Sequence, residues 1–329
     1  MATTPQTNST LAEIAQVVRE NDNFVICGHV SPDGDCLGSQ LALWHALQKI
    51  GKHSTCLLVR DEPIGVSLGW LPGVEDMVPA CAFDGECDVF IGVDVPTRER
   101  IGEAVTVLDR ANTSITIDHH ASRETMCEHV YVDPDSASAS ILVWELVKLL
   151  CDEPPLDSAL CAYTGVVTDT GGFRFQNSDE HAFAAASELI AYGVDPALVA
   201  TSVFQNRTMA SLKLEALVIE RMKVVSGGEG AISWITASDM EALGAVKADA
   251  EPLVDAVRSL SGTRVACILR EQDGKIRGSL RAKDDTDVSA LARELNGGGH
   301  RAAAGLTLDM PLDEAVDFMA DKLAGLLDR

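Results

Sequence analysis

Apolar runs alternate with amphipathic stretches along the first half of the chain. Four short apolar runs are expected to form strands, at residues 24–28, 55–59, 88–93 and 114–118. A first helix should begin at the capping box of Thr10 and Glu13. Amphipathic stretches predict further helices, at residues 36–50, 137–151, 156–168 and 179–192. Strands this apolar are typical of a parallel sheet covered on both faces, so the pattern predicts an α/β fold with a doubly wound parallel sheet.

The pattern changes after the SGGEG segment at 226–230 to short strands that are joined by turns. RVACILRE and KIRGSLRAK flank an Asp273-Gly274 turn, which is the signature of a hairpin. Two more helices, at 287–295 and 312–327, complete a smaller α+β domain. Helices at 196–204 and 208–222 would connect the two halves, and 329 residues exceed the usual size of one core. We expect a first domain, a helical linker and a second domain at residues 1–192, 193–222 and 223–329.

Acidic residues and histidines follow several of the apolar runs. A parallel sheet brings the carboxyl ends of its strands to one edge, where these side chains would meet. The segments are GHVSPDGD with His29, Asp33 and Asp35, VFIGVD with Asp94, SITIDHH with Asp118, His119 and His120, and TGVVTDTGGF with Asp169. Mixed carboxylate and imidazole donors favour a metal site, although the first segment alone could be an ordinary turn.

The four segments GHVSPDGD, VFIGVD, TIDHH and TGVVTDTGGF resemble motifs I to IV of the DHH phosphoesterase family, which is named for the triplet at 118–120. RGSLRAK at 277–283 and NGGGHRAAAG at 296–305 resemble the DHHA1 substrate domain of that family. The resemblance implies a metal-binding catalytic DHH domain, a DHHA1 domain and hydrolysis of phosphoesters.

The resemblance also implies two divalent ions that share Asp94. One ion would be held by His29, Asp33 and Asp94, and the second by Asp35, Asp94, His119 and Asp169. Mn²⁺ suits these donors best, with Mg²⁺ or Co²⁺ as substitutes. Asp118 is expected outside the ligand set, where it would orient His119 through its second ring nitrogen. Asp94 and His120 are the candidate catalytic residues. His120 would contact a phosphate oxygen or protonate the leaving alkoxide, and a purely structural role for it stays open.

Residues of the second domain are expected to bind the substrate. Through the resemblance, these are Arg281, Gly298, Gly299 and His300, which would grip the terminal nucleotide or its phosphate. The glycines could also serve only to end a helix. Within motif I, Cys36 is either a small buried filler or an oxidation-sensitive neighbour of the metals.

The charge and composition narrow the expected substrates and location. The chain has 26 Lys and Arg against 50 Asp and Glu, a formal net charge of −24, which argues against a long nucleic-acid track. Nine cysteines without CxxC pairs are typical of reduced thiols in a cytoplasmic protein. The polar start MATTPQTNST and the lack of a long apolar run predict neither a signal peptide nor a membrane span.

In its length, the chain resembles the compact members of the family that are called nanoRNases. The resemblance to this group implies that the protein cleaves very short RNAs and removes the 3′-phosphate of 3′-phosphoadenosine 5′-phosphate. An alternative with the same two domains is a phosphodiesterase for cyclic di-AMP and its linear dinucleotide. A distant alternative is a catalytically silent nucleotide-binding regulator, which would be free to lose some of the candidate ligands. The sequence also leaves a homodimer open.

Overall fold

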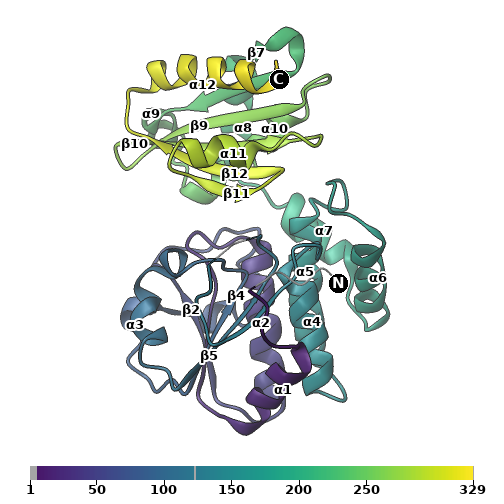
Figure 1. The fold of residues 1–329 in the computed structure, drawn as a ribbon. Helices are drawn as coiled ribbons and strands as arrows, with labels where there is room; N and C mark the ends of the chain where they lie inside the picture. The colour runs from purple at the N-terminus through teal and green to yellow at the C-terminus, as the bar shows by residue number, and fades with distance from the viewer. Residues whose placement is uncertain (1–5, 122–123, 329) are drawn as a thin grey trace. The chain divides into compact units, whose positions relative to one another are not determined.

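The computed structural model describes residues 6–121 and 124–328 and divides the chain into two compact units (Figure 1). The first unit ends at Asn206 and the second begins at Arg207. Helix α7 (Pro196–Phe204) therefore belongs to the first unit, and α8 (Met209–Arg221) belongs to the second. The division falls inside the segment that the sequence pattern suggested as a connector.

Among the described residues, the first unit contains one sheet of six parallel strands in the order β3-β2-β1-β4-β5-β6. The strands are β1 (Phe24–Cys27), β2 (Ser54–Leu58), β3 (Val78–Pro79), β4 (Val89–Val93), β5 (Thr113–Asp118) and β6 (His129–Val132). This confirms the predicted doubly wound parallel sheet. The strand order reverses between β1 and β4, and open α/β sheets bind their ligands beyond the carboxyl ends of the strands at such a reversal.

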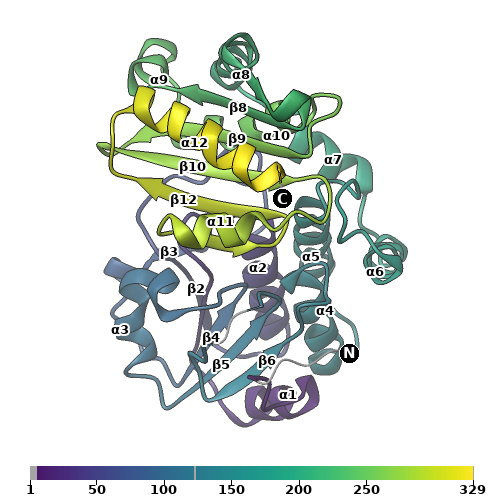
Figure 2. The ribbon, with the colours of Figure 1, turned by 45° about the horizontal axis from the view of Figure 1, so that its top comes forward.

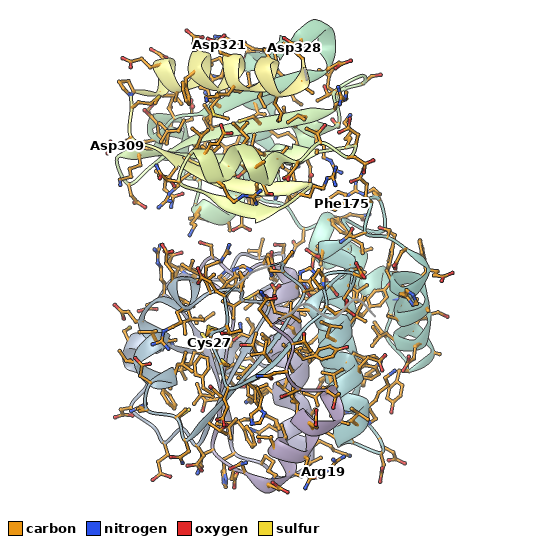
Figure 3. The ribbon with its side chains drawn as sticks, in the orientation of Figure 1. Arg19, Cys27, Phe175, Asp309, Asp321 and Asp328 are labelled. Atoms are coloured by element: carbon orange, nitrogen blue, oxygen red, sulfur yellow. The ribbon has the colours of Figure 1, made fainter. Side chains whose placement is uncertain are left out.

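Helices cover both faces of this sheet (Figures 1 and 2). The helices of this unit are α1 (Leu11–Glu20), α2 (Gly34–Lys49), α3 (Val105–Leu108), α4 (Ala139–Leu150), α5 (Leu156–Asp169), α6 (Glu180–Ala191) and α7, with 3₁₀ turns at Val74–Asp76, Ala80–Ala82 and Arg98–Ala104. On one face, Leu41, Trp144 and Val166 pack against strand residues such as Ile26. On the other face, Ile101 and its neighbours cover the strand side chains that include Cys27, which Figure 3 labels. Both faces being buried explains why the strands are so apolar.

The described part of the second unit contains a mixed six-stranded sheet in the order β11-β12-β10-β9-β8-β7. The strands are β7 (Lys223–Val225), β8 (Gly230–Ile235), β9 (Val265–Gln272), β10 (Lys275–Ala282), β11 (Gly298–His300) and β12 (Ala303–Leu308). Apart from α8, the helices are α9 (Ala237–Leu243), α10 (Leu253–Arg258), α11 (Val288–Glu294) and α12 (Leu312–Leu327), with 3₁₀ turns at Ser226–Gly228 and Lys247–Ala250. The architecture confirms the smaller α+β domain.

The predicted hairpin and the glycine-rich segment both form antiparallel strands in this unit. Strands β9 and β10 pair antiparallel, and Asp273 and Gly274 adopt φ angles of 53° and 72° at the turn, as a tight hairpin requires. The glycine-rich segment forms β11, in which Gly298 pairs with Gly305 of β12.

No single helix in the described residues is long and apolar enough to cross a membrane. Helices α6 and α7 reach that length and composition only as a pair, which is bent by 114° at its break.

Candidate metal centre

The carboxyl ends of three neighbouring strands bring the predicted ligands of the first unit together. His29 follows β1, Asp94 follows β4, and His119 and His120 follow β5. β4 pairs with both β1 and β5, so these side chains converge where the strand order reverses. Three overlapping groups of ligand atoms lie within 4.8 Å of one another: His29 with Cys36 and Asp94, Asp94 with His119 and His120, and Asp35 with His119 and Asp169.

Helix ends position the two aspartates of motif I. Asp33 is the N-cap of α2, and its Oδ1 accepts the backbone N–H groups of Asp35 and Cys36 at 3.1 and 3.0 Å. Asp35 therefore lies in the first turn of the helix and is buried. Its two carboxylate oxygens accept the N–H groups of Ala139 and Ser140 at the start of α4, at 2.7 and 2.9 Å. The position of Asp35 thus depends on a second helix N-terminus, which also favours its negative charge.

Asp94 lies between two imidazole rings. Its Oδ2 is 3.4 Å from Nε2 of His29, and its Oδ1 is 3.4 Å from Nε2 of His119. Asp94 is 2% exposed, and its buried Oδ1 has no hydrogen-bond partner among the described atoms. The residue also has a φ of 53°, in the left-handed region where few side chains are found. Unusual backbone of this kind concentrates at functional sites, where the surrounding structure holds it.

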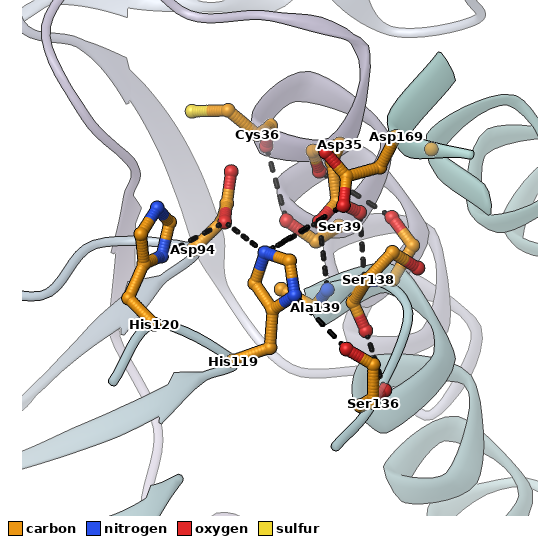
Figure 4. A network of polar contacts seen from close by, with 12 residues as sticks. Asp35, Cys36, Ser39, Asp94, His119, His120, Ser136, Ser138, Ala139 and Asp169 are labelled. Atoms are coloured by element: carbon orange, nitrogen blue, oxygen red, sulfur yellow. Dashed lines mark hydrogen bonds and ion pairs between the residues drawn. The ribbon is translucent and has the colours of Figure 1, made fainter. Parts of the chain in front are cut away.

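Backbone carbonyls orient the rings of His29 and His119. Nδ1 of His29 lies 3.0 Å from the carbonyl oxygen of Val30, and Nδ1 of His119 lies 3.1 Å from that of Ser136. With Nδ1 donating to a carbonyl, Nε2 carries the lone pair, as in histidines that bind metals. Nε2 of His119 is the atom that faces the carboxylates in Figure 4.

The spacing of the ligand atoms fits ions shared between them. Nε2 of His29 lies 3.8 Å from Asp33, and Nε2 of His119 lies 3.7 Å from Asp35 and 3.8 Å from Asp169. These separations exceed ordinary hydrogen bonds. Two ligands with bonds of about 2.0–2.2 Å to one ion stand roughly 3.0–3.6 Å apart, close to what is observed. The donor set therefore fits divalent cations.

Asp118 contacts a different histidine from the one we expected. Its Oδ1 accepts the backbone N–H of His119 at 2.9 Å, but its close ring contact is with Nδ1 of His120, at 2.7 Å. The Ser136 carbonyl occupies the place beside the His119 ring that the sequence analysis gave to Asp118. The reason is geometric, because adjacent residues after a strand point in different directions. His120 is therefore the ring that Asp118 orients, and its Nδ1 also lies 3.5 Å from Asp94 Oδ1.

The charges of the cluster perturb each other strongly. Burial and the carboxylates of Asp94 and Asp169 raise the pKa of Asp35 well above its ordinary value. Burial, with Asp94 contributing, also raises the pKa of Asp169 to about 6, although His119 opposes this. Burial disfavours the charged form of His29, but its acidic neighbours outweigh that effect and raise its pKa to about 9. Bound divalent cations would oppose these upward pKa shifts, because metal ligands bind in their deprotonated forms.

Asn177 belongs to the same cluster and was missed by the sequence analysis. Its Nδ2 donates to the backbone oxygen of Asp169 at 3.1 Å and lies 3.4 Å from Oδ2 of that residue. It also donates to the carbonyl of Ala137 at 3.0 Å, just before α4. The only available signal was its position eight residues after Asp169, which does not distinguish it from its polar neighbours.

The expected substrate residues of the second unit lie on β10 and β11, which are separated in the sheet by β12. Arg281 is in β10, where its Nη1 donates to the carbonyl of Leu280 at 3.0 Å. Gly299 has a φ of 136°, and a Cβ there would lie 2.5 Å from the Ala303 carbonyl oxygen. Gly298 has nothing within 4 Å of its Cβ position. The packing thus requires a glycine at 299 but not at 298. The backbone of His300 is in β11, and its side-chain role lies outside the described part of the structure.

Comparison with known proteins connects this arrangement to one family. The DHH family, N-terminal domain, matches residues 23–166, and the DHHA1 domain matches residues 235–326. A "bifunctional oligoribonuclease and PAP phosphatase NrnA" from Thermus thermophilus is 30% identical over 96% of this chain and 94% of its own length. A "cyclic-di-AMP phosphodiesterase GdpP" from Geobacillus thermodenitrificans is 27% identical over 92% of this chain, which corresponds to 47% of that relative.

A solved structure shows a similar fold over nearly the whole chain. It is an "exopolyphosphatase-related protein" from Bacteroides fragilis, with a TM-score of 0.88, 29% identity and coverage of 97% of both chains. The two matched domains, the full-length relative and the buried cluster of histidines and aspartates agree with one another. The chain therefore belongs to the DHH/DHHA1 phosphoesterase family and is a metal-dependent phosphoesterase.

Proposed function

We propose that this phosphoesterase uses two metal ions to hydrolyse short oligoribonucleotides and to remove the 3′-phosphate of 3′-phosphoadenosine 5′-phosphate. The observation that carries the two-ion part is the position of Asp94, whose two oxygens each lie 3.4 Å from Nε2 of a different histidine. A carboxylate placed in this way can bridge two ions. The substrates are supported by the Thermus thermophilus relative, which is named for both activities.

The proposed ligands divide into two sets around Asp94. His29, Asp33 and Asp94 would hold one ion, and Asp35, Asp94, His119 and Asp169 the other. The distances from the two Nε2 atoms to the carboxylates support this division. Oxygen and imidazole donors suit Mn²⁺, with Mg²⁺ or Co²⁺ as substitutes. When bound, two such ions polarise the phosphate and activate the attacking water.

The protein residues around the centre hold the reacting groups and move a proton. Asp118 holds Nδ1 of His120 at 2.7 Å, so Nε2 is the ring nitrogen that would act on the substrate. We assign His120 to contact a phosphate oxygen or to protonate the leaving alkoxide. Its ring is 14% exposed, which is enough for a substrate oxygen to approach while most bulk water is excluded.

The second unit would bind the rest of the nucleotide. Arg281, Gly298, Gly299 and His300 are the proposed contacts. Gly298 supports this role because the space at its Cβ position is open, so a ligand could approach the backbone there. The net charge of −24 opposes the phosphates of longer strands, which favours short substrates. All nine cysteines are free, which supports a cytoplasmic location.

A length series of oligoribonucleotides tests the proposed substrates. RNAs of two, three, five, ten and 24 nucleotides are hydrolysed with Mn²⁺ at fixed salt, beside 3′-phosphoadenosine 5′-phosphate. We expect the fastest turnover for roughly two to five nucleotides, because each further phosphate adds repulsion without a contact. A 24-mer that is degraded as fast as a dimer would contradict the proposal.

Cyclic di-AMP is the second candidate substrate. It is favoured by the 27% identity to a cyclic-di-AMP phosphodiesterase over 92% of this chain. Including cyclic di-AMP and its linear dinucleotide in the same series separates the two, since a clear preference for the cyclic compound would replace the first proposal. A chain that binds Mn²⁺ and nucleotides but hydrolyses none of them would be a binding regulator instead.

A further inference from the structure

A cysteine lies within the candidate metal centre. The ligand atoms of His29, Cys36 and Asp94 are all within 4.8 Å of one another, and all three residues are buried. Figure 4 shows the Cys36 sulfur on the side of Asp94 that faces away from His119. The thiol therefore lies only beside the ion site proposed for His29, Asp33 and Asp94, which we call the His29 half of the centre.

The surrounding backbone keeps this sulfur close to His29. Cys36 is in the first turn of α2, and its Sγ accepts the backbone N–H of His29 at 3.2 Å. A Cβ at position 28 would lie 2.2 Å from the sulfur, so only glycine leaves it room there. The sulfur is thus held beside an imidazole and a carboxylate, and these are donor types that can bind one metal ion together with a thiolate.

Of the two oxygen ligands proposed for this ion, Asp33 is the one most easily replaced. The Asp33 side chain is 61% exposed and lies 3.8 Å from Nε2 of His29, whereas Cys36 is fully buried. A zinc ion forms bonds of about 2.3 Å to sulfur and about 2.0–2.1 Å to nitrogen, so shifts of about 1 Å would bring all three ligand atoms onto one ion. Such shifts are within the reach of side-chain rotation.

We propose that Cys36 gives the His29 half of the centre a thiolate ligand for thiophilic divalent ions such as Zn²⁺ or Cd²⁺. The inference rests on the metal centre of the proposed function. Mn²⁺ prefers oxygen and nitrogen and leaves the thiol protonated. A thiophilic ion binds His29, Asp94 and Cys36, and the thiol proton passes to the solvent as the sulfur–metal bond forms. Thiophilic ions therefore compete with Mn²⁺ at this half of the centre.

Cadmium binding to the full chain, without any substrate, tests the proposal. Every protein carries Cys81→Ser and Cys127→Ser, because Cys81 is exposed and Cys127 is partly exposed, and either thiol would bind cadmium independently. After removal of metal with a chelator, Cd²⁺ is titrated and the ultraviolet thiolate-to-cadmium charge-transfer band is recorded. We expect the band in the parent protein and its loss in Cys36→Ser. The half-saturation concentration should rise about tenfold or more for Cd²⁺ and stay within about threefold for Mn²⁺.

Cys27→Ala is the matched control. Cys27 is also fully buried and lies close by in β1, but its sulfur donates to the Gly28 carbonyl and belongs to none of the three ligand groups of the described residues. This variant should keep the band. A band that persists in Cys36→Ser, or equal losses of Mn²⁺ and Cd²⁺ affinity in that variant, would overturn the proposal.

Cadmium NMR of the parent protein provides a measurement that needs no Cys36 variant to fold. A chemical shift in the range of a thiolate-bound ion is expected, and a shift typical of oxygen and nitrogen ligands alone would refute the role of Cys36. The outcome is independent of the substrate. A chain that hydrolyses none of the proposed nucleotides but shows the band would keep the Cys36 inference, while hydrolysis without the band would keep only the proposed function.

Discussion

Replacing Asp94 by asparagine is the most direct test of the two-ion centre. The substitution keeps the size of the side chain and removes only the negative charge between His29 and His119. Asparagine also tolerates a φ of 53° as readily as aspartate does, so the backbone after β4 should not change. Alanine adopts this left-handed conformation less readily. Any loss of function in Asp94→Asn can then be attributed to the missing carboxylate.

The geometry sets the expected size of the loss. Removing a group that only supports a metal ligand costs about 10- to 100-fold in metal affinity or activity. Asp94 lies 3.4 Å from Nε2 of two histidines, so a single change acts on both ions. Because Asp94 is itself a proposed ligand of both ions, the loss should be at least the product of the two factors, about 100- to 10,000-fold in kcat/KM, or about 2.7–5.5 kcal/mol of lost transition-state stabilisation.

Asp118→Asn is the control for this experiment. Asp118 contacts the ring of His120, which is not one of the proposed metal ligands. Its replacement should therefore lower kcat/KM by only about 10- to 100-fold. Both variants are assayed for Mn²⁺-dependent hydrolysis of a diribonucleotide, and their bound Mn²⁺ is counted after equilibrium dialysis. Two bound ions and activity within tenfold of the parent in Asp94→Asn would refute the bridging role. Activity that persists in the parent after a chelator has removed all bound metal would contradict metal dependence itself.

Three further predictions concern other parts of the chain. Gly165→Ala would place a Cβ 1.9 Å from Ser140 Oγ, so the first unit should lose about 1–3 kcal/mol in urea unfolding. Hydrogen bonding from Arg221 lowers the pKa of Asp239 to about 2, which is below its value in the unfolded chain. The free energy of unfolding should therefore include a contribution from this ion pair above about pH 4, and it should decrease by about 2 kcal/mol as the pH falls towards 2. Amide exchange in β9 measures this decline, and Asp239→Asn should abolish it. Arg281→Ala should raise KM for nucleotides about 10- to 100-fold with Mn²⁺ binding unchanged; loss of the metal would contradict its assignment to the substrate.

Long apolar segments made most of the fold predictable. The runs that became β1 and β4 were recognisable because a strand buried on both faces must be apolar along its whole length. The segment that became β5 was recognisable by the alternation of Ile115 and Ile117 with polar residues. The two-residue β3 and the four-residue β6 were not expected from the pattern. Segments this short carry too little periodicity, and they become strands only because a neighbouring strand supplies hydrogen-bond partners.

The candidate ligands were recognisable from the sequence by residue type and order, since few other roles require aspartate and histidine directly after apolar strands. Their partners were decided only by the tertiary structure. Asp35 is held by N–H groups 104 and 105 residues away, and the His119 ring faces the Ser136 carbonyl instead of Asp118. Nothing local specifies such contacts, because they depend on how α4 packs against α2 and on the direction in which each side chain leaves the backbone. The sequence by itself thus determined which atoms could bind metal, and the packing of distant helices decided where each of those atoms lies.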